Sequence, residues 1–412
     1  MCSVIKGKEE ERRVEERKPT VLLVHNHYRI PGGEDSVVKN EEELLKTHGH
    51  RVHVYTRSNS EFDERGLFSR IRLLVDSVFS LKTYREIRKL IRENGVDIVH
   101  VHNTLSVISP SVYYAALSCG VPVVQTVHNF RLVCPGALLY RAGRVCEECL
   151  QHGPGRAVRY SCYRNSRMQT LISTLILQIH RMTGIYRRIN YICLTPFNRD
   201  KLLSVNKKGR EIFPGERVWI KPNFCLDIPG ESLRQEGSVR KRQFLCVGRL
   251  EKEKGIDLLL EAWKEIKDYE LLLCGTGTQE EWCRQFLIGN RMDNVRLLGQ
   301  VSQAEVAALL EESQAMIFAS RVYEGFPMTI VESFRSATPV IANDIGNGAA
   351  LIKPGVNGLI FAQNSPEALR KIILSWEGGM NEGARKAYEK LYSPEKNYHR
   401  LFRIYRTVLQ SG

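Results

Sequence analysis

Two glutamates in one segment have a spacing that suits a sugar nucleotide. Glu324 and Glu332 enclose GFPMTIV, and the segment directly follows the apolar run AMIFAS. Pro327 suits the first position of a helix there, because that position needs no amide proton, and Gly325 permits a tight turn beside a ligand. Unpaired amides of a first helical turn can hold hydroxyl or phosphate oxygens. The two carboxylates can then accept hydrogen bonds from hydroxyl groups at either end of the ligand; the alternative is a pair of exposed helix-end charges.

Two basic residues follow another predicted strand, in the segment VGRLEKEKG. Arg249 offers a planar fork to a diphosphate, and Lys254 offers a point charge. Two fixed cations would stabilise the charge that a diphosphate leaving group develops. No Asp-X-Asp pair for a divalent metal occurs in the sequence, so we expect no cofactor in catalysis. The alternative is a solvated surface loop.

Two series of alternating strands and helices position these segments. Short apolar runs predict strands at 20–26, 50–56, 97–102 and 121–128, and then at 242–248, 269–275, 294–299, 315–320 and 339–343. Runs that are apolar on both faces and alternate with helices predict an α/β fold with two doubly wound parallel sheets. Ligands of such sheets bind beyond the carboxyl ends of the strands.

Composition shifts predict the division of the chain. Residues 1–18 are charged and predict a disordered or frayed extension. A first Rossmann-like domain is expected over 19–220 and a second over 243–392, joined by a polar linker at 221–242. A final helix within 393–412 is expected to pack back on the first domain.

The combined motifs resemble the retaining glycosyltransferases of family 4, which have the GT-B fold of two Rossmann-like domains facing a cleft. The resemblance rests on Gly248-Arg249 with Lys254-Gly255, on the Glu324–Glu332 pair, and on the loop Gly32-Gly33-Glu34. It extends over residues 20–409. It implies that the N-terminal domain binds the acceptor and the C-terminal domain binds the donor.

The resemblance also implies roles for single residues. Arg249 and Lys254 would contact the donor diphosphate, Glu332 the nucleotide ribose, and Glu324 the transferred sugar. His128, at the end of a strand, would lie near the donor sugar and the acceptor oxygen, the alternative being a histidine satisfied by its own surroundings. We therefore expect the catalytic groups Glu324, His128, Arg249 and Lys254. Further donor contacts are expected from Gly32, Gly33, Gly248, Gly275, Gly325, Phe326, Pro327, Thr329, Ile330 and Val331.

The expected reaction moves a hexose or related sugar from a UDP- or GDP-linked donor to a glycan or lipid-linked acceptor, in polysaccharide or cell-envelope glycan biosynthesis. Resemblance implies retention of configuration, with the leaving phosphate oxygen taking the acceptor proton. A phosphorylase of similar architecture would instead need pyridoxal phosphate on a lysine. A different class is a basic, zinc-stapled nucleic-acid binder with a vestigial cleft, although no aromatic side chains are interleaved with the basic ones as a base-stacking surface needs. We expect no nucleic-acid partner.

Four of the eleven cysteines lie close together in the sequence. Cys146 and Cys149 form C-x2-C, with Cys134 and Cys162 about a dozen residues away on either side. Four thiolates suit a closed tetrahedral zinc site, which would staple a long loop that has little core. The alternatives are unmetallated thiols or an iron–sulfur cluster, and His152 is a spare ligand. Cysteines inside predicted strands favour reduced thiols in the cytoplasm.

Positive charge is concentrated in the first part of the chain. Residues 1–230 carry 36 Lys and Arg against 23 Asp and Glu, and the remainder is nearly balanced. The start of the sequence lacks an apolar core of signal-peptide length. Basic amphipathic stretches at 67–93 and 164–190 predict peripheral association with an anionic membrane surface. The alternative is ordinary core-facing helices with solvated arginines.

Overall fold

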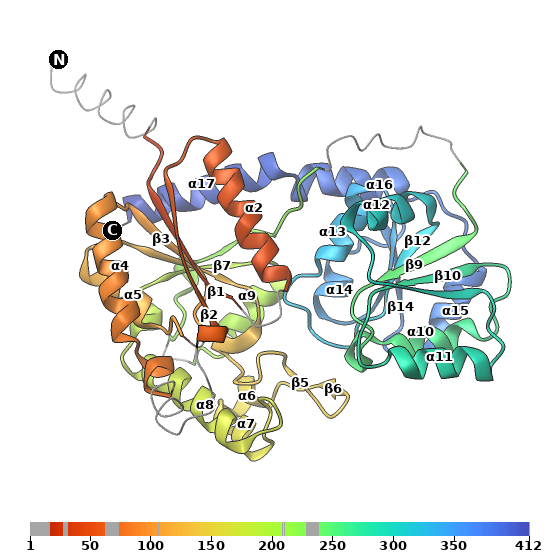
Figure 1. Ribbon diagram of the computed structural model, residues 1–412, viewed down its shortest axis with the longest axis horizontal. Coiled ribbons are helices and arrows are strands. Elements are labelled where there is room, and N and C mark those ends of the chain that lie inside the picture. The colour runs from red at the N-terminus through yellow and green to blue at the C-terminus, as the bar shows by residue number, and fades with distance from the viewer. Residues whose placement is uncertain are drawn as a thin grey trace.

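The computed structural model describes residues 17–27, 32–61, 74–105, 107–207, 209, 211–227 and 239–411 of the 412-residue chain. The chain forms two lobes that lie side by side, each built on its own sheet (Figure 1). Both six-stranded sheets are parallel throughout. The predicted pair of doubly wound parallel sheets is therefore confirmed.

The N-terminal sheet has the strand order β2-β1-β3-β4-β7-β8. Its strands are β1 Val21–His27, β2 Val52–Ser58, β3 Ile98–Asn103, β4 Val123–Val127, β7 Asn190–Cys193 and β8 Val218–Ile220. Almost every residue of β1, β3 and β4 is buried, as expected of strands covered on both faces, and this includes the histidines of β3. The chain reverses direction across the sheet between β1 and β3, the kind of point where such folds bind ligands.

The C-terminal sheet repeats this topology in the order β11-β10-β9-β12-β13-β14. Its strands are β9 Gln243–Val247, β10 Glu270–Cys274, β11 Val295–Gly299, β12 Ala315–Phe318, β13 Val340–Asn343 and β14 Gly358–Phe361. The equivalent reversal lies between β9 and β12. The segments with Arg249 and Glu324 follow these two neighbouring strands, so both emerge at one edge of the sheet.

Helices cover the sheets. In the N-terminal lobe they are α2 Gly33–Thr47, α4 Leu81–Asn94, α5 Ser111–Ser118, α6 Glu148–His152, α7 Gly155–Arg159, α8 Arg167–Met182 and α9 Pro196–Leu203. In the C-terminal lobe they are α10 Ile256–Trp263, α11 Glu280–Gly289, α12 Gln303–Glu312, α13 Met328–Arg335, α14 Gly346–Ala350, α15 Pro366–Leu374 and α16 Asn381–Ala387. A two-stranded hairpin, β5 Tyr140–Arg141 and β6 Arg144–Val145, projects from the first lobe.

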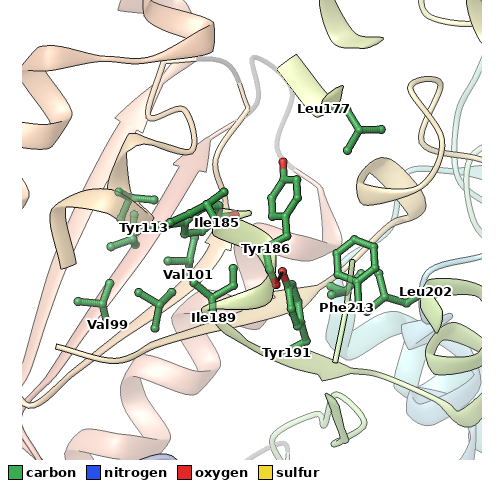
Figure 2. Close-up of a cluster of buried hydrophobic side chains, with 14 of the residues drawn as sticks. Val99, Val101, Tyr113, Leu177, Ile185, Tyr186, Ile189, Tyr191, Leu202 and Phe213 are labelled. Atoms are coloured by element: carbon green, nitrogen blue, oxygen red, sulfur yellow. Dashed lines mark hydrogen bonds between the residues drawn. The ribbon is translucent and has the colours of Figure 1, made fainter. Parts of the chain in front are cut away.

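Figure 2 shows part of the apolar core of the N-terminal lobe. Val99 and Val101 of β3 lie near Tyr113 of α5, and Tyr191 of β7 continues the cluster. Leu177 joins it from α8 and is 4 % exposed, so this helix buries one face against the lobe. The core fixes the carboxyl ends of β3 and β4, from which candidate site residues emerge.

The last helix, α17 Pro394–Gln410, leaves the C-terminal lobe and crosses back over the first (Figure 1). Its buried face includes Tyr398, Leu401 and Tyr405, which pack in one apolar cluster with Val21 and Leu23 of β1. Burying these side chains fastens the end of the chain to the first sheet.

The predicted linker begins with a buried stretch. Residues 221–225 follow β8 and are buried, although the first of them is a lysine. Residues 228–238 lie outside the described residues, as do residues 1–16 of the predicted extension. Arg17 and Lys18, the end of that extension, instead contact Asp97 and the carbonyl of His48.

Candidate active site

A cavity of about 800 Å³ lies between the lobes, at the carboxyl ends of both sheets. Its walls contain most of the site residues that the sequence predicts. These are Gly32, Gly33, His128, Gly248, Arg249, Lys254, Glu324, Gly325, Phe326, Pro327 and Thr329. Positions almost 300 residues apart in the sequence therefore face the same space.

Lys254 and Glu324 form an ion pair in this cavity, with Nζ and Oε1 2.5 Å apart. The hydroxyl of Ser320 donates to the same carboxylate oxygen at 2.7 Å. Both charged side chains are more than two-thirds buried, so water screens them only partly. An incoming anion would compete with Glu324 for the Lys254 ammonium.

Glycines bring the basic loop into place. Gly255 follows Lys254 with φ +73°, and a Cβ atom there would lie 2.1 Å from the carbonyl oxygen of Ala319. Gly248 has φ +153° with open space around it. Arg249 next to it is exposed, and within the described ranges its guanidinium makes no hydrogen bond or ion pair. The two predicted cations thus differ in their partners. Lys254 is paired with Glu324, whereas Arg249 faces the cavity without a carboxylate partner among the described residues.

Gly325 makes the contact between the lobes possible. A Cβ atom at this position would lie 1.8 Å from the backbone oxygen of His128 in the other lobe. The sequence predicted that this glycine allows close approach to a ligand. Gly325 lines the cavity, and it also closely approaches His128, because the loops after β4 and β12 meet here.

The helix that follows begins one residue later than predicted. Pro327 is the N-cap of α13, with ψ +95°, and Met328 is the first helical residue. The amides of Met328 and Thr329 are the early donors left for a ligand. Ile330 donates its amide to the Pro327 carbonyl at 3.1 Å, and the side chains of Ile330 and Val331 are fully buried in the core of the lobe. The amide of Ile330 is therefore occupied at the helix start, and a donor contact of Val331 would have to come from its backbone amide, because both side chains pack in the core.

Glu332 lies one turn further along α13, beyond the cavity wall. Burial raises the pKa of its carboxyl group, and nearby Arg335 opposes this only partly. Among the described residues no side chain or backbone group hydrogen-bonds to the carboxylate. A desolvated, unpartnered carboxylate costs stability and is typical of a functional position.

Gly275 does not contribute to the cavity wall. Its φ is +134°, and a Cβ atom there would lie 1.9 Å from the carbonyl oxygen of Gly248. The expected donor contact is therefore replaced by a packing role, because two strand ends come together where only glycine fits.

The N-terminal side of the cavity is formed by the start of α2. Gly32 caps this helix and donates its amide proton to the Asp35 carboxylate at 2.7 Å. The sequence predicts that this amide contacts the donor, but in the structure it is already occupied. The amide of Gly33, at the first helical position, remains. Asp35 also hydrogen-bonds to His25 at 3.0 Å and His27 at 2.6 Å, which holds the helix start against the end of β1.

His128 follows β4 and is 8 % exposed. It lines the large cavity and also a smaller one, of about 80 Å³, inside the N-terminal lobe. Burial, together with neighbouring His102 and His25, holds the pKa of His128 well below its usual range. The ring is therefore neutral at physiological pH.

Comparison with known proteins agrees with this arrangement. The family model "Glycosyltransferase Family 4" matches residues 31–187, and the model "Glycosyl transferases group 1" matches residues 231–391. The chain is 32 % identical to an uncharacterised glycosyltransferase of Methanocaldococcus jannaschii, over 91 % of this chain and 95 % of that one. The chain belongs to glycosyltransferase family 4.

Solved structures show the fold of this family 4 glycosyltransferase. A glycosyltransferase from Rickettsia africae superposes with a TM-score of 0.68 at 17 % identity, covering 96 % of this chain and all of that one. HepE of Anabaena in complex with UDP and glucose superposes with a TM-score of 0.61 at 15 % identity, covering 93 % and 98 %. The predicted GT-B fold is confirmed, and the alternative of a nucleic-acid binder with a vestigial cleft gains no support.

An asparagine cluster that the sequence did not reveal connects the lobes of the glycosyltransferase beside the cavity. Asn347 of α14 donates to the carbonyl oxygens of Glu324 and Gly325, at 2.6 and 2.9 Å. It also contacts Thr195 and Asn198, which lie at the start of α9 in the other lobe. Asn198 in turn donates to Gly325 at 2.6 Å. A single asparagine forms no recognisable sequence motif. Its role in joining the two lobes is therefore visible only in the structure.

The cysteine-rich segment folds as an appendage of the N-terminal lobe, below α9 in Figure 1. A hydrogen bond from Cys149 and the amides after Cys134 outweigh burial and lower the pKa of Cys134 to about 6. Cys162 packs against the same turn, since a Cβ atom added to Gly136 would lie 3.3 Å from the Cβ atom of Cys162. However, the groups of three or more side chains placed to share a metal ion in the described part of the chain do not include these cysteines. The zinc site stays a prediction.

Two other groups of potential metal ligands occur among the described residues. Glu41, His100 and His102 form one, and His25, His27 and Asp35 form the other. Lys221 already neutralises the Glu41 carboxylate at 2.8 Å. In the second group both rings hydrogen-bond to Asp35. Each group thus has a polar partner within the protein, while Oε1 of Glu41, Nε2 of His102 and Nδ1 of His25 make no hydrogen bond among the described residues.

The basic segment 164–190 forms α8 and its flanks, and its outward face is apolar. Thr170, Thr174 and Leu177 face the lobe. The opposite face carries a stripe of apolar side chains that are 39–78 % exposed, namely Met168, Leu171, Leu175, Ile179 and Met182. In the described part of the chain, no helix is long and apolar enough to cross a membrane. Of the other basic segment, residues 67–73 lie outside the described residues, and α4 packs Ile87 and Ile91 into the core.

Proposed function

We propose that the enzyme transfers a sugar from a nucleotide diphosphate sugar to a glycan or lipid-linked acceptor, with retention of anomeric configuration. The observation that carries the proposal is the convergence of Arg249, Lys254 and Glu324 on one cavity between the lobes. The cavity has the size of a small-molecule site. The Anabaena relative binds UDP and glucose on the same fold.

In the proposed complex the diphosphate lies between the Arg249 guanidinium and the Lys254 ammonium, near the free amides of α13. Lys254 would then exchange Glu324 for phosphate oxygens. The freed Glu324 carboxylate would face the sugar, and the unpartnered Glu332 carboxylate would accept hydrogen bonds from the ribose hydroxyl groups. No group of the protein hydrogen-bonds to the Glu332 carboxylate among the described residues, and this favours a hydrogen bond from a ligand.

In the proposed reaction the bond between the anomeric carbon and the diphosphate oxygen breaks, and the two cations stabilise the charge that develops on the phosphate. The acceptor hydroxyl attacks the same face of the sugar. Its proton passes to the departing phosphate oxygen, so the protein need not supply a strong base. The products are the glycosylated acceptor and a nucleoside diphosphate.

A screen of UDP- and GDP-sugars, read as released nucleoside diphosphate, tests this function. We expect turnover of at least one donor. Arg249→Ala should lower kcat by about 100-fold, because a charge that stabilises the leaving group is lost. Glu332→Ala should instead weaken donor binding by about 10-fold, the worth of hydrogen bonds to a charged group.

Arg242→Ala is the matched control, because Arg242 is exposed and lies outside the cavity. It should leave both constants within about twofold. The site assignment is wrong if Arg249→Ala and Glu332→Ala resemble this control.

We further propose that the enzyme works at an anionic membrane surface on the cytoplasmic side. The exposed apolar stripe of α8 supports this, as do the arginines at both ends of the segment, Arg164, Arg167, Arg187 and Arg188. Ile176 and Leu177 of the same helix line the smaller cavity, next to His128. A lipid-linked acceptor reaching that cavity from the membrane would arrive beside the donor.

Co-sedimentation with vesicles tests the membrane proposal. The protein should bind phosphatidylglycerol vesicles and not phosphatidylcholine vesicles. Leu171→Glu with Leu175→Glu should reduce the bound fraction at least about fivefold, because apolar burial and charge attraction are both lost. Leu374→Glu alters an exposed leucine of α15 in the other lobe and should change nothing. Equal binding of all three proteins would contradict the proposal.

A structural zinc ion held by Cys134, Cys146, Cys149 and Cys162 remains our proposal for the appendage. Purified protein should contain about one zinc per chain by mass spectrometry. Cys149→Ser should abolish the zinc, whereas Cys119→Ser, outside the appendage, should retain it. Zinc-free protein with unchanged thermal stability would contradict the proposal.

A further inference from the structure

Behind His128, a row of ionisable side chains runs through the interior of the N-terminal lobe. It consists of His102 on β3, Glu41 on α2, and Lys221 after β8. Each is 3 % exposed or less. Burying two opposite charges away from water costs free energy unless they are paired, so this arrangement requires an explanation.

The contacts connect the row end to end. Nδ1 of His102 lies 3.0 Å from Nε2 of His128. On its other side, Nε2 of His102 lies 3.4 Å from Oε1 of Glu41, an electrostatic contact without hydrogen-bond geometry. Oε2 of Glu41 accepts from the Lys221 ammonium at 2.8 Å. His102 therefore stands between the carboxylate and the ring that reaches the cavity.

The charge states follow from these surroundings. Burial opposes ionisation of Glu41, but Lys221 and the adjacent rings outweigh it, so the pKa of Glu41 lies well below its usual range. Burial and the neighbouring His100 lower the pKa of His102 to about 4. At physiological pH the row is thus a carboxylate followed by two neutral imidazole rings.

One ring nitrogen of each neutral histidine carries a proton. The negative charge of the Glu41 carboxylate determines which nitrogen of His102 this is. A lone pair on Nε2 of His102 would face the negative charge of Glu41 in a poorly screened interior, whereas an N–H there is attracted. Nδ1 of His102 then has the lone pair and must accept. His128 therefore donates from Nε2. Its own lone pair is left on Nδ1, which makes no hydrogen bond within the described ranges.

The C-terminal helix holds the far end of the row. Asn397 of α17 accepts from Lys221 at 3.0 Å and donates to the carbonyl of Pro222 at 2.6 Å. Tyr405 of α17 hydrogen-bonds to Nδ1 of His100 at 2.6 Å. That nitrogen also lies 2.9 Å from Oε1 of Glu41, so the carboxylate lies against both rings. Of the two rings it is His102 that contacts His128, whereas the other nitrogen of His100 hydrogen-bonds to Thr126 at 2.7 Å.

We propose that Glu41 and His102 are positioning residues, which fix His128 as the tautomer protonated on Nε2 and present its unprotonated Nδ1 to the active-site cavity. This inference rests on the proposed function. In the transfer reaction, Nδ1 accepts a hydrogen bond from a hydroxyl group of the acceptor or of the donor sugar and orients it. No net proton transfer to His128 is involved, since the leaving phosphate takes the acceptor proton.

Histidine ¹⁵N NMR of the full-length protein tests the tautomer directly, without any donor. The His128 signal is assigned by its loss in His128→Gln. We expect one tautomer with the proton on Nε2 in the parent protein. His102→Asn keeps the Glu41–Lys221 pair and breaks the link to His128, and the double variant Glu41→Gln with Lys221→Met removes both charges together. Both variants should show a mixture of tautomers.

The kinetic consequence is measured on the same proteins. Both variants should lose about tenfold or more in kcat with an active donor, with the donor KM unchanged within about twofold. Tyr398→Phe is the matched control, because the hydroxyl group of this α17 tyrosine hydrogen-bonds to His50 and not to a member of the row. It should keep both the single tautomer and the turnover.

Three results would overturn the inference: a proton on Nδ1 of His128 in the parent protein, a single unchanged tautomer in both variants, or full turnover in a variant with mixed tautomers. Failure of the proposed function appears separately, as an absence of turnover of every nucleotide sugar by the parent protein. The NMR result stands or falls independently of that outcome.

Discussion

Replacing Glu324 by glutamine is expected to lower kcat by about 100-fold or more, with donor KM changed less than about threefold. One oxygen of Glu324 accepts from both Lys254 and Ser320, so its position is fixed before the donor binds. Glutamine keeps the shape and loses the negative charge. That charge would stabilise the sugar as positive charge develops at its anomeric carbon, and losing one preorganised electrostatic contact costs about this much in enzymes.

Steady-state kinetics with the donor found in the screen would measure the effect. Glu253→Gln is the matched control, because Glu253 lies one residue from Lys254 and outside the cavity wall. It should keep kcat within about twofold. If Glu324→Gln has the same kcat as this control, Glu324 does not take part in the transfer.

The second large effect concerns stability. Lys221→Met should lower the free energy of unfolding by about 3–5 kcal/mol, because it leaves the Glu41 carboxylate buried without its counterion. For a lobe of this size that corresponds to a fall in Tm of about 10 °C. Thermal unfolding followed by circular dichroism measures it, with Lys396→Met, an exposed lysine of α17, as the control.

The pH dependence gives this prediction a definite sign. In the parent protein the folded-state pKa of Glu41 is depressed, so its contribution to stability is full above the unfolded-state value and is lost as pH falls through the folded value. Without Lys221 the buried carboxylate favours its protonated form. The Tm deficit of Lys221→Met relative to the parent should therefore shrink between about pH 7 and pH 5. A constant deficit would contradict this account of the pair.

The sequence predicts a part of the site correctly where charged residues directly follow predicted parallel strands. Arg249, Lys254 and Glu324 follow apolar runs, and the ends of parallel strands share an edge, so their meeting in one cavity follows from strand order. The family resemblance implies donor contacts from Ile330 and Val331 through the amides of their segment. The structure buries both, because the period of α13 turns them toward the core.

The sequence by itself determined the two doubly wound sheets and the loops that carry the charged groups, since apolar periodicity and glycine placement are local properties. Only the tertiary structure decided which contacts join the lobes and what lies behind His128. Asn347 and Gly325 meet residues of the other lobe, and Glu41 and Lys221 pair across 180 positions. Such pairings depend on the packing of whole lobes, and no local pattern of residue types encodes them.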